Sequence, residues 1–397
     1  MSSPAPARPR PVHQAADLLA AYLPGSFYYS SARGSLLADG VYSPVRAVPG
    51  KRARAAAEVL DAALVAGVTE PVVVGAIGFR PDAPSSLVVP AVVRRAGPPK
   101  ASGPVAPLGG NWSVSPRPAP EVYTTAVAKA LDEIRDGDLR KIVLARCLDV
   151  TGGDPIAVPR LLARLVHADP GAHAFAVDVS APGDPAPRTL IGASPELLVS
   201  RRGRVVTANP LAGSRPRVAD DAENARRIDD LLASEKDRAE HAHVAAQVAE
   251  VLGRFCVDLD VPGEPEVIGT PTMWHLSTRI SGRLADPDDA GSSALGLAEA
   301  LHPTPAVCGV PTALARDTIA ALEPEDRGYY AGLVGWTDQD GDGEWVVTIR
   351  CAEVRDRTVR LFAGAGVVAG SDPAAELAET GAKFGTMLRA LGLEGAA

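Results

Sequence analysis

Two titratable side chains stand beside short apolar runs in the middle of this sequence. Lys141 opens the run Lys-Ile-Val-Leu-Ala-Arg, and Glu196 follows a proline in the run Gly-Ala-Ser-Pro-Glu-Leu-Leu. An amine held uncharged can take a proton, and a carboxyl in an apolar setting can donate one. The two residues are therefore a candidate base and a candidate acid. Judged on the local pattern alone, a lysine at a strand end is usually solvated, and the glutamate could only cap its turn.

Three further carboxylates could bind a metal ion. Glu240 lies in a predicted helix, and Glu376 and Glu379 lie in the last predicted helix, where a spacing of three places them on one face. Carboxylate oxygens without clustered His or Cys suit Mg²⁺, which takes few protein ligands and keeps water and substrate around it. The same pattern is typical of solvated helix faces, and Glu379 and Lys383 have the spacing of a surface salt pair.

The elements that must position these groups can be predicted from periodicity. In the predicted strand 141–150, odd-numbered residues share a face, which places the head of Lys141 at the mouth of an apolar wall. A second strand is predicted over 345–354, with Arg350 on the face that points away from the core. Residues 220–255 are predicted to form one long helix, because apolar side chains recur there at spacings of three and four.

Composition along the chain predicts its organisation. Residues 1–15 are rich in Pro, Ala and Arg and are expected to form a disordered tail. Residues 16–397 are expected to form a single domain, with an N-terminal part over 16–110 and a core over 120–393. The Pro- and Gly-rich stretch 97–120 favours a surface excursion at the seam between them. Strands and helices do not alternate one for one, which favours α+β architecture with largely antiparallel sheets and helices packed outside.

The overall composition excludes several classes of function. The net charge is −8 and no basic stripe occurs, so nucleic acid is not an expected partner. There is no run of about 18 apolar residues and no leader pattern at the N-terminus, so we expect a cytoplasmic protein without a membrane partner. The four cysteines are far apart and lie mostly in apolar runs, which is typical of free buried thiols.

Five separated motifs, in the same order along the chain, resemble the chorismate-utilising enzymes and, within them, the isochorismate synthases of siderophore type. The resemblance extends from about Glu121 to Leu393. It rests on the two runs that hold Lys141 and Glu196, and on Asp237-Arg238-Ala239-Glu240-His241, His302-Pro303-Thr304-Pro305-Ala306-Val307-Cys308-Gly309 and Glu376-Leu377-Ala378-Glu379-Thr380-Gly381. It implies two layered sheets with the active site in a cleft between them, as in anthranilate synthase component I.

The resemblance also assigns roles to the titratable residues. Lys141 is implied to activate water, since anthranilate synthase component I carries glutamine at this position and uses ammonia. Glu196 is implied to protonate the departing C4 hydroxyl of chorismate. Glu240 and Glu379 are implied to bind Mg²⁺ directly, with Glu376 nearby through water.

Other residues are implied to bind the substrate. Arg350, Tyr330, Lys383 and the backbone of Gly364-Ala365-Gly366 would hold the enolpyruvyl carboxylate. The remaining residues expected beside the substrate are Ala212, Gly213, His275 and Ala306. Aminodeoxychorismate synthases place a nucleophilic lysine where this chain has Ala212, which argues against covalent catalysis.

The prediction from sequence is therefore a Mg²⁺-dependent isochorismate synthase that acts on chorismate and feeds a catechol siderophore route. We expect a monomer without a glutamine amidotransferase subunit. Three alternatives stay open at this point: a salicylate synthase, which goes on to eliminate pyruvate; an isochorismate synthase of menaquinone biosynthesis; and a non-catalytic relative that only binds chorismate.

Overall fold

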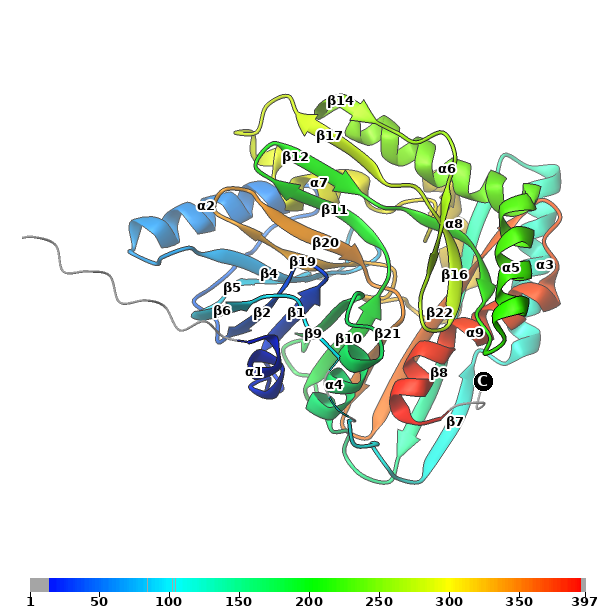
Figure 1. Ribbon diagram of the computed structural model, residues 1–397, viewed down its shortest axis with the longest axis horizontal. Helices are drawn as coiled ribbons and strands as arrows, with labels where there is room; N and C mark the ends of the chain where they lie inside the picture. Colours follow the sequence, from blue (N-terminus) through cyan, green and yellow to red (C-terminus); the bar gives the residue numbers. More distant parts are fainter. Residues whose placement is uncertain (1–13, 84, 102, 104, 394–397) are drawn as a thin grey trace, which may run out of the picture.

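The frame of the protein is two large antiparallel sheets and one small sheet (Figure 1). The computed structural model describes residues 14–83, 85–101, 103 and 105–393. The first large sheet has ten strands. Nine of them run in the order β18 (Gly309–Val310), β8 (Lys141–Gly152), β22 (Thr358–Val368), β21 (Cys351–Arg355), β10 (Arg188–Ser194), β9 (His173–Asp178), β1 (Phe27–Ser31), β2 (Gly34–Asp39) and β6 (Val92–Ala96), and β7 (Trp112–Arg117) also pairs with β8.

The other two sheets have nine and three strands. The nine-stranded sheet has the order β14 (Cys256–Asp260), β17 (Ile280–Leu284), β12 (Val205–Ala208), β11 (Leu197–Arg202), β20 (Gly343–Val347), β19 (Leu333–Asp338), β4 (Val72–Ile77), β5 (Ser85–Val89) and β3 (Ser43–Pro44). The small sheet has the order β13 (Leu211–Pro216), β16 (Met273–Ser277) and β15 (Glu266–Gly269). Helix α6 contacts both β16 of this small sheet and β22 of the ten-stranded sheet.

Strands from the first hundred residues are built into both large sheets. β1 pairs with β9 in the first, and β4 pairs with β19 in the second. The stretch 97–120 was predicted to be a surface excursion, but it contains β7, which pairs with β8 from Trp112 to Arg117. Alternation of Trp, Val and polar residues over 112–117 is a strand signal that the surrounding Pro and Gly residues obscured.

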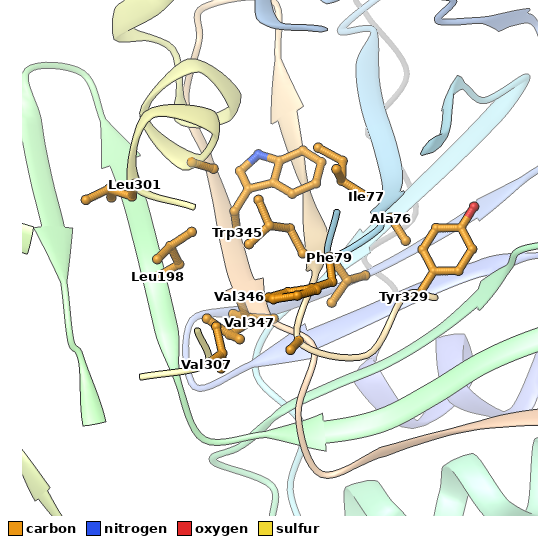
Figure 2. Packing of buried hydrophobic residues seen from close by; sticks show 14 of the residues in the cluster. Ala76, Ile77, Phe79, Leu198, Leu301, Val307, Tyr329, Trp345, Val346 and Val347 are labelled. Carbon is orange, nitrogen blue, oxygen red and sulfur yellow. The ribbon is translucent and has the colours of Figure 1, made fainter. Parts of the chain in front are cut away.

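Helices cover the sheets on their outer sides, as the α+β prediction required. They are α1 (Ala15–Ala20), α2 (Arg52–Val65), α3 (Pro120–Asp136), α4 (Val158–Ala168), α5 (Asp221–Ala233), α6 (Glu235–Leu252), α7 (Ala294–Leu301), α8 (Thr312–Leu322) and α9 (Pro373–Leu391). One core joins the facing sides of the two large sheets, and Figure 2 shows Trp345 of β20 packed there with Ile77, Phe79 and Leu198. A second core lies between the first sheet and α1, α4 and α9.

The predicted long helix over 220–255 is wrong in one respect, because it is two helices. Ser234 ends α5 in an extended conformation and caps α6, where its side chain accepts a hydrogen bond from the backbone N–H of Asp237. A serine followed by acidic residues is a strong helix start. The break matters because α6, starting at Glu235, directs Glu240 toward the first sheet.

The predicted strand over 345–354 is also interrupted. β20 ends at Val347 and β21 starts at Cys351, so the two halves belong to different sheets. Arg350 lies at this break with φ of 50°, a left-handed conformation that residues other than glycine rarely adopt. The interruption turns Arg350 inward, and its side chain is buried instead of pointing away from the core.

Other features of the described chain bear on the remaining expectations. The tail expected over 1–15 lies outside the described residues except for Gln14, which is the N-cap of α1, and Ala15, which is its first residue. No helix among the described residues is long and apolar enough to cross a membrane. The cysteines, which are Cys147, Cys256, Cys308 and Cys351, are buried free thiols.

Candidate active site

A pocket forms where β21 stops pairing with β22. Their pairing reaches only Ala352 with Leu361, so the rest of β22 has a free edge on this side. That edge is surrounded by helices α6 and α9, the small sheet and the β10–β11 turn. The pocket is lined by Val143, Pro195, Glu196, Leu211, Ala212, Gly213, Ser214, Glu240, His275, Ala306, Val307, Tyr330, Ile349, Arg350, Gly364, Gly366, Glu379 and Lys383. It contains every predicted site residue except Lys141, Ala365 and Glu376.

Glu196 is a buried carboxyl in the wall of this pocket. It follows Pro195 in the turn between β10 and β11, where its own N–H donates to Ser194 Oγ at 3.2 Å. Burial raises its pKa to about 7, although the charges of Lys141 and Arg350 act in the opposite direction. A carboxyl with a pKa of about 7 is partly protonated at neutral pH and can therefore donate a proton.

Arg350 is a buried cation without an ionic partner. It is 7 % exposed, and no carboxylate of the described chain lies within ion-pair distance of it. Its Nε is buried without a hydrogen-bond partner in the same described part, while Nη2 lies 3.4 Å from His275 Nε2. A buried charge costs free energy unless it is paired. The guanidinium therefore presents an unsatisfied fork to the pocket, as a site for a carboxylate would require.

His275 lies on β16 and is neutral at physiological pH. Burial, and then the Arg350 charge, lower its pKa well below the usual value. A neutral ring next to the guanidinium does nothing to compensate the charge of Arg350, on which the more distant carboxylates Glu379 and Glu196 act. His275 therefore contributes a polar, uncharged wall beside the guanidinium.

Lys141 lies under the pocket and contacts it through Glu240. Its side chain is fully buried, and Nζ lies 3.0 Å from Glu240 Oε1. The expectation of a solvated lysine at a strand end does not apply, because the side chain is buried and its amine faces Glu240 of α6. Lys141 pairs with Val368 across the sheet, and the next pocket residue on its face, Val143, pairs with Gly366.

Three carboxylates lie near one another beside the pocket, and each has a lysine partner. Lys141 contacts Glu240, Lys236 Nζ lies 2.7 Å from Glu376 Oε1, and Lys383 Nζ lies 2.6 Å from Glu379 Oε1. Burial and the charge of Glu379 raise the pKa of Glu376. Burial would also raise the pKa of Glu379, but the Lys383 ammonium lowers it overall. These carboxylates repel one another and depend on cations for compensation.

Their oxygen atoms are of the kind that Mg²⁺ takes as ligands, although each carboxylate contacts a lysine in this structure. Burial lowers the pKa of Lys236, but the hydrogen bond to Glu376 and the charges of Glu240 and Glu379 raise it overall. The Lys236 ammonium is therefore attracted by all three carboxylates. Within the part of the chain that the structure describes, no three His, Cys, Asp or Glu side chains form a metal cage. Oxygen ligands without a closed cage suit an ion that keeps water and substrate in its sphere.

The glycines of β22 make room for side chains that enter the pocket. A Cβ on Gly366 would stand 2.2 Å from Glu240 Oε1, and a Cβ on Gly364 would stand 2.9 Å from the Tyr330 hydroxyl. Lys383 Nζ donates to the Gly364 carbonyl at 2.9 Å on the free edge of β22. Ala365 is buried on the opposite face of the strand and does not line the pocket.

Two further predicted residues lie on a bulge of β13. Pairing with β16 shifts register between Ala212 and Ser214, and Gly213 there has φ of +74°. A Cβ on Gly213 would stand 3.0 Å from the Asp237 Cβ, so glycine lets β13 approach α6. Ala306 lies in the loop before β18 and lines the pocket from the other side.

Sequence reasoning missed Ser214 and Lys236. Ser214 Oγ donates to Glu379 Oε1 at 3.1 Å and helps to orient that carboxylate. Lys236 precedes Glu240 by four residues, so helical spacing could have placed it on the same face. Ser214 directly follows the predicted site residues Ala212 and Gly213, but its partner on α9 cannot be read from local sequence.

The comparisons with known proteins agree with this geometry. Residues 105–392 match the family model described as chorismate binding enzyme. The chain is 49% identical over 389 residues to isochorismate synthase DhbC of Bacillus subtilis, covering 96% of this chain and 97% of the relative. It is 41% identical over 370 residues to the vibriobactin-specific isochorismate synthase of Vibrio cholerae, covering 93% and 92%. The chain belongs to the chorismate-binding enzyme family.

Solved structures support the same assignment. A putative 2,3-dihydroxybenzoate-specific isochorismate synthase, DhbC of Bacillus anthracis, superposes with a TM-score of 0.91 at 45% identity, covering 96% of this chain and 99% of that one. Anthranilate synthase component I of Streptococcus pneumoniae superposes with a TM-score of 0.71 at 23% identity, covering 90% and 92%. The second likeness concerns the fold alone, and it confirms the predicted fold class.

Proposed function

We propose that this protein is an isochorismate synthase that converts chorismate to isochorismate with Mg²⁺ as cofactor. The observation that carries the proposal is the pairing, in one pocket, of a carboxyl with a pKa of about 7 and a buried guanidinium without an ionic partner. The first can donate a proton at neutral pH, and the second requires an anion. Chorismate is a dicarboxylate whose C4 hydroxyl must be protonated to leave.

In the proposed reaction Lys141 takes a proton from water, and the resulting hydroxide attacks C2 of the ring. The ring double bonds shift, the C4–O bond breaks, and Glu196 gives its proton to the departing hydroxyl, which leaves as water. Lys141 and Glu196 thus act at opposite ends of the rearranging bonds. After this step Lys141 is protonated and Glu196 is deprotonated, and both must return to their initial states before the next turnover.

The substrate carboxylates are proposed to bind at two places. Arg350 would donate a pair of hydrogen bonds to the enolpyruvyl carboxylate, next to Tyr330 and Lys383. Glu240 and Glu379, with Glu376 behind them, would hold Mg²⁺ for the ring carboxylate. When bound, the ion neutralises the repulsion between these glutamates and the dianionic substrate.

The pathway assignment rests on the relatives named above. One is specific to vibriobactin and another to 2,3-dihydroxybenzoate, a catechol acid. We therefore place the product in a catechol siderophore route.

The deciding experiment is a single incubation of purified protein with chorismate and Mg²⁺, followed by chromatographic separation of products. Isochorismate as the end product is expected. Accumulation of salicylate and pyruvate would instead identify a salicylate synthase. Tight binding of chorismate without any turnover would identify a non-catalytic relative.

A further inference from the structure

Strand β8, which carries Lys141, lacks a strand partner along part of one edge. On that edge β18 pairs with it at Lys141 and Ile142, and β7 pairs with it from Cys147 onward. Between these points the Val143 N–H still donates to the Cys308 carbonyl at 2.7 Å, but the Val143 carbonyl and the Ala145 N–H have no strand partner. Unpaired N–H and C=O groups in a buried strand cost free energy unless another group satisfies them.

The gap is filled by an ion pair between Glu323 and Arg327, which follow α8. Ala145 N–H donates to Glu323 Oε1 at 2.7 Å, and Arg327 Nη2 donates to the Val143 carbonyl at 2.7 Å. The two side chains also bond each other, with Arg327 Nε 2.8 Å from Glu323 Oε2. One carboxylate and one guanidinium therefore supply the acceptor and the donor that a neighbouring strand would have supplied.

The same guanidinium extends to two other walls of the pocket. Arg327 Nη1 donates to the Val307 carbonyl at 2.7 Å, in the loop that carries Ala306. Its carbon Cζ lies 4.4 Å from the Phe79 ring centroid and 5.9 Å from that of Tyr330. Arg327 is 4 % exposed, so these contacts are made in a buried environment where hydrogen bonds to charged groups are strong.

We propose that the Glu323–Arg327 pair is a positioning clamp that replaces a missing strand and fixes the location of the Lys141 amine relative to the pocket. Neither residue lines the pocket, so neither is a catalytic residue. The clamp acts through the backbone of β8, two and four residues from Lys141, and through the loop at Val307. This inference rests on the proposed function, since it assigns the positioning to the base of that reaction.

The test compares Arg327→Ala with Arg360→Ala as a matched control. Arg360 lies on β22 and pairs with Asp149 of β8 and with Glu325, two residues from each member of the clamp. It does not line the pocket and makes no bond to Val143, Ala145 or Val307, so it tests whether loss of any neighbouring ion pair has the same effect. We expect Arg327→Ala to lower kcat about tenfold or more, with KM changed less than about threefold, because misplacement of a reacting group by about 1 Å has effects of this size. Arg360→Ala should change neither constant.

Chemical rescue separates positioning from mere stability. Guanidinium ion at low millimolar concentration should restore part of the kcat of Arg327→Ala, whereas ammonium should not, because only a planar fork can bridge Glu323 and two carbonyls. Neither ion should change Arg360→Ala. Absence of rescue together with a kcat within twofold of wild type would overturn the proposal, and so would a loss confined to KM.

A second variant covers the case in which Arg327→Ala fails to fold. The double variant Glu323→Met, Arg327→Met replaces a buried ion pair with apolar side chains of similar length, which often retains stability. We expect its melting temperature to stay near that of wild type, its kcat to fall, and amide exchange at Ala145 to accelerate. Unchanged exchange at Ala145 would refute the clamp, whatever product the wild type makes. A wild type that makes no isochorismate would refute only the proposed function.

Discussion

Lys141 Nζ and Glu240 Oε1 lie 3.0 Å apart beneath the pocket, so the proposed base and a proposed metal ligand share one contact. The lysine side chain is fully buried and that of the glutamate is 12% exposed. A cation that binds Glu240 from the pocket competes with the lysine for the same carboxylate. The charge state of one residue is therefore coupled to the occupancy of the other.

Replacing Glu240 with Gln should abolish most of the Mg²⁺-dependent turnover, because the amide keeps the shape but loses the charge that attracts the ion. Isothermal titration with Mg²⁺ should show weaker binding, and chelation with EDTA should stop the wild-type reaction until Mg²⁺ is returned. Glu250→Gln is the control, since Glu250 lies exposed on the same helix and pairs with Arg254. Undiminished wild-type activity in excess EDTA would disprove the metal assignment.

Lys141→Ala should stop isochorismate formation while chorismate binding persists, since the lysine lies under the pocket and does not line it. The loss should be about 10²- to 10⁴-fold, the usual contribution of a general base. In ¹⁸O-labelled water the wild-type reaction should place the label at C2 of the product. An unlabelled C2 oxygen, detected by mass spectrometry, would mean internal migration of the hydroxyl and would remove the role given to Lys141.

The acid should control the alkaline side of the pH profile. Glu196 must be protonated to donate, and its pKa is raised to about 7, so kcat/KM should fall as the pH rises through about 7. Glu196→Gln should bind chorismate but lose roughly 10²- to 10⁴-fold in turnover. The residual kcat/KM of this variant should no longer fall as the pH rises through about 7. If kcat/KM of the variant still fell over the same pH range, the acid would be another group.

Arg350→Met should raise KM more than it lowers kcat, because it removes the fork proposed for the enolpyruvyl carboxylate. A hydrogen bond to a charged group contributes about 1.5 to 3 kcal/mol, which corresponds to roughly 10- to 150-fold in affinity. Steady-state kinetics with chorismate measures the effect. Arg355→Met is the control, since Arg355 ends β21, the strand that follows Arg350, and is exposed. Equal KM values for both variants would place the carboxylate elsewhere.

Gly366→Ala should weaken Mg²⁺ binding while the fold is retained. The new Cβ would stand 2.2 Å from Glu240 Oε1, and the end of that side chain can move where backbone cannot. Displacement of a reacting group by about 1 Å can reduce turnover by about 10²-fold. Gly97→Ala is the control, because a Cβ there meets nothing within 4 Å. A wild-type Mg²⁺ titration for Gly366→Ala would show that the glycine does not position Glu240.

Local patterns predicted those parts of the fold that local forces determine. The odd-numbered face of β8 follows from strand alternation, and the placement of Glu376 and Glu379 on one face of α9 follows from helical spacing. The pocket residues came from motif resemblance, and the structure brings most of them together. Burial of Arg350 was not predictable from alternation, since a strand continuing past Val347 would have turned it outward.

The missed contacts are those that join distant segments. Lys236 meets Glu376, and Ser214 meets Glu379, across more than a hundred residues of chain. Such pairs depend on which helix lies over which strand, and a single sequence without known contacts does not contain that information. Glu323 and Arg327 belong to the same class, because their role depends on where β18 and β7 end.

The pairing of Lys141 with Val368 has a consequence for synthesis of the chain. At about 5 to 20 residues per second, β8 leaves the ribosome roughly 10 to 45 s before the last residues of β22 are made. During that interval a long apolar strand has its main partner edge open, which is the kind of edge that associates with other chains. Nascent chains of this protein should therefore depend on chaperones until residues near 368 emerge, and a chain truncated before β22 should aggregate rather than fold.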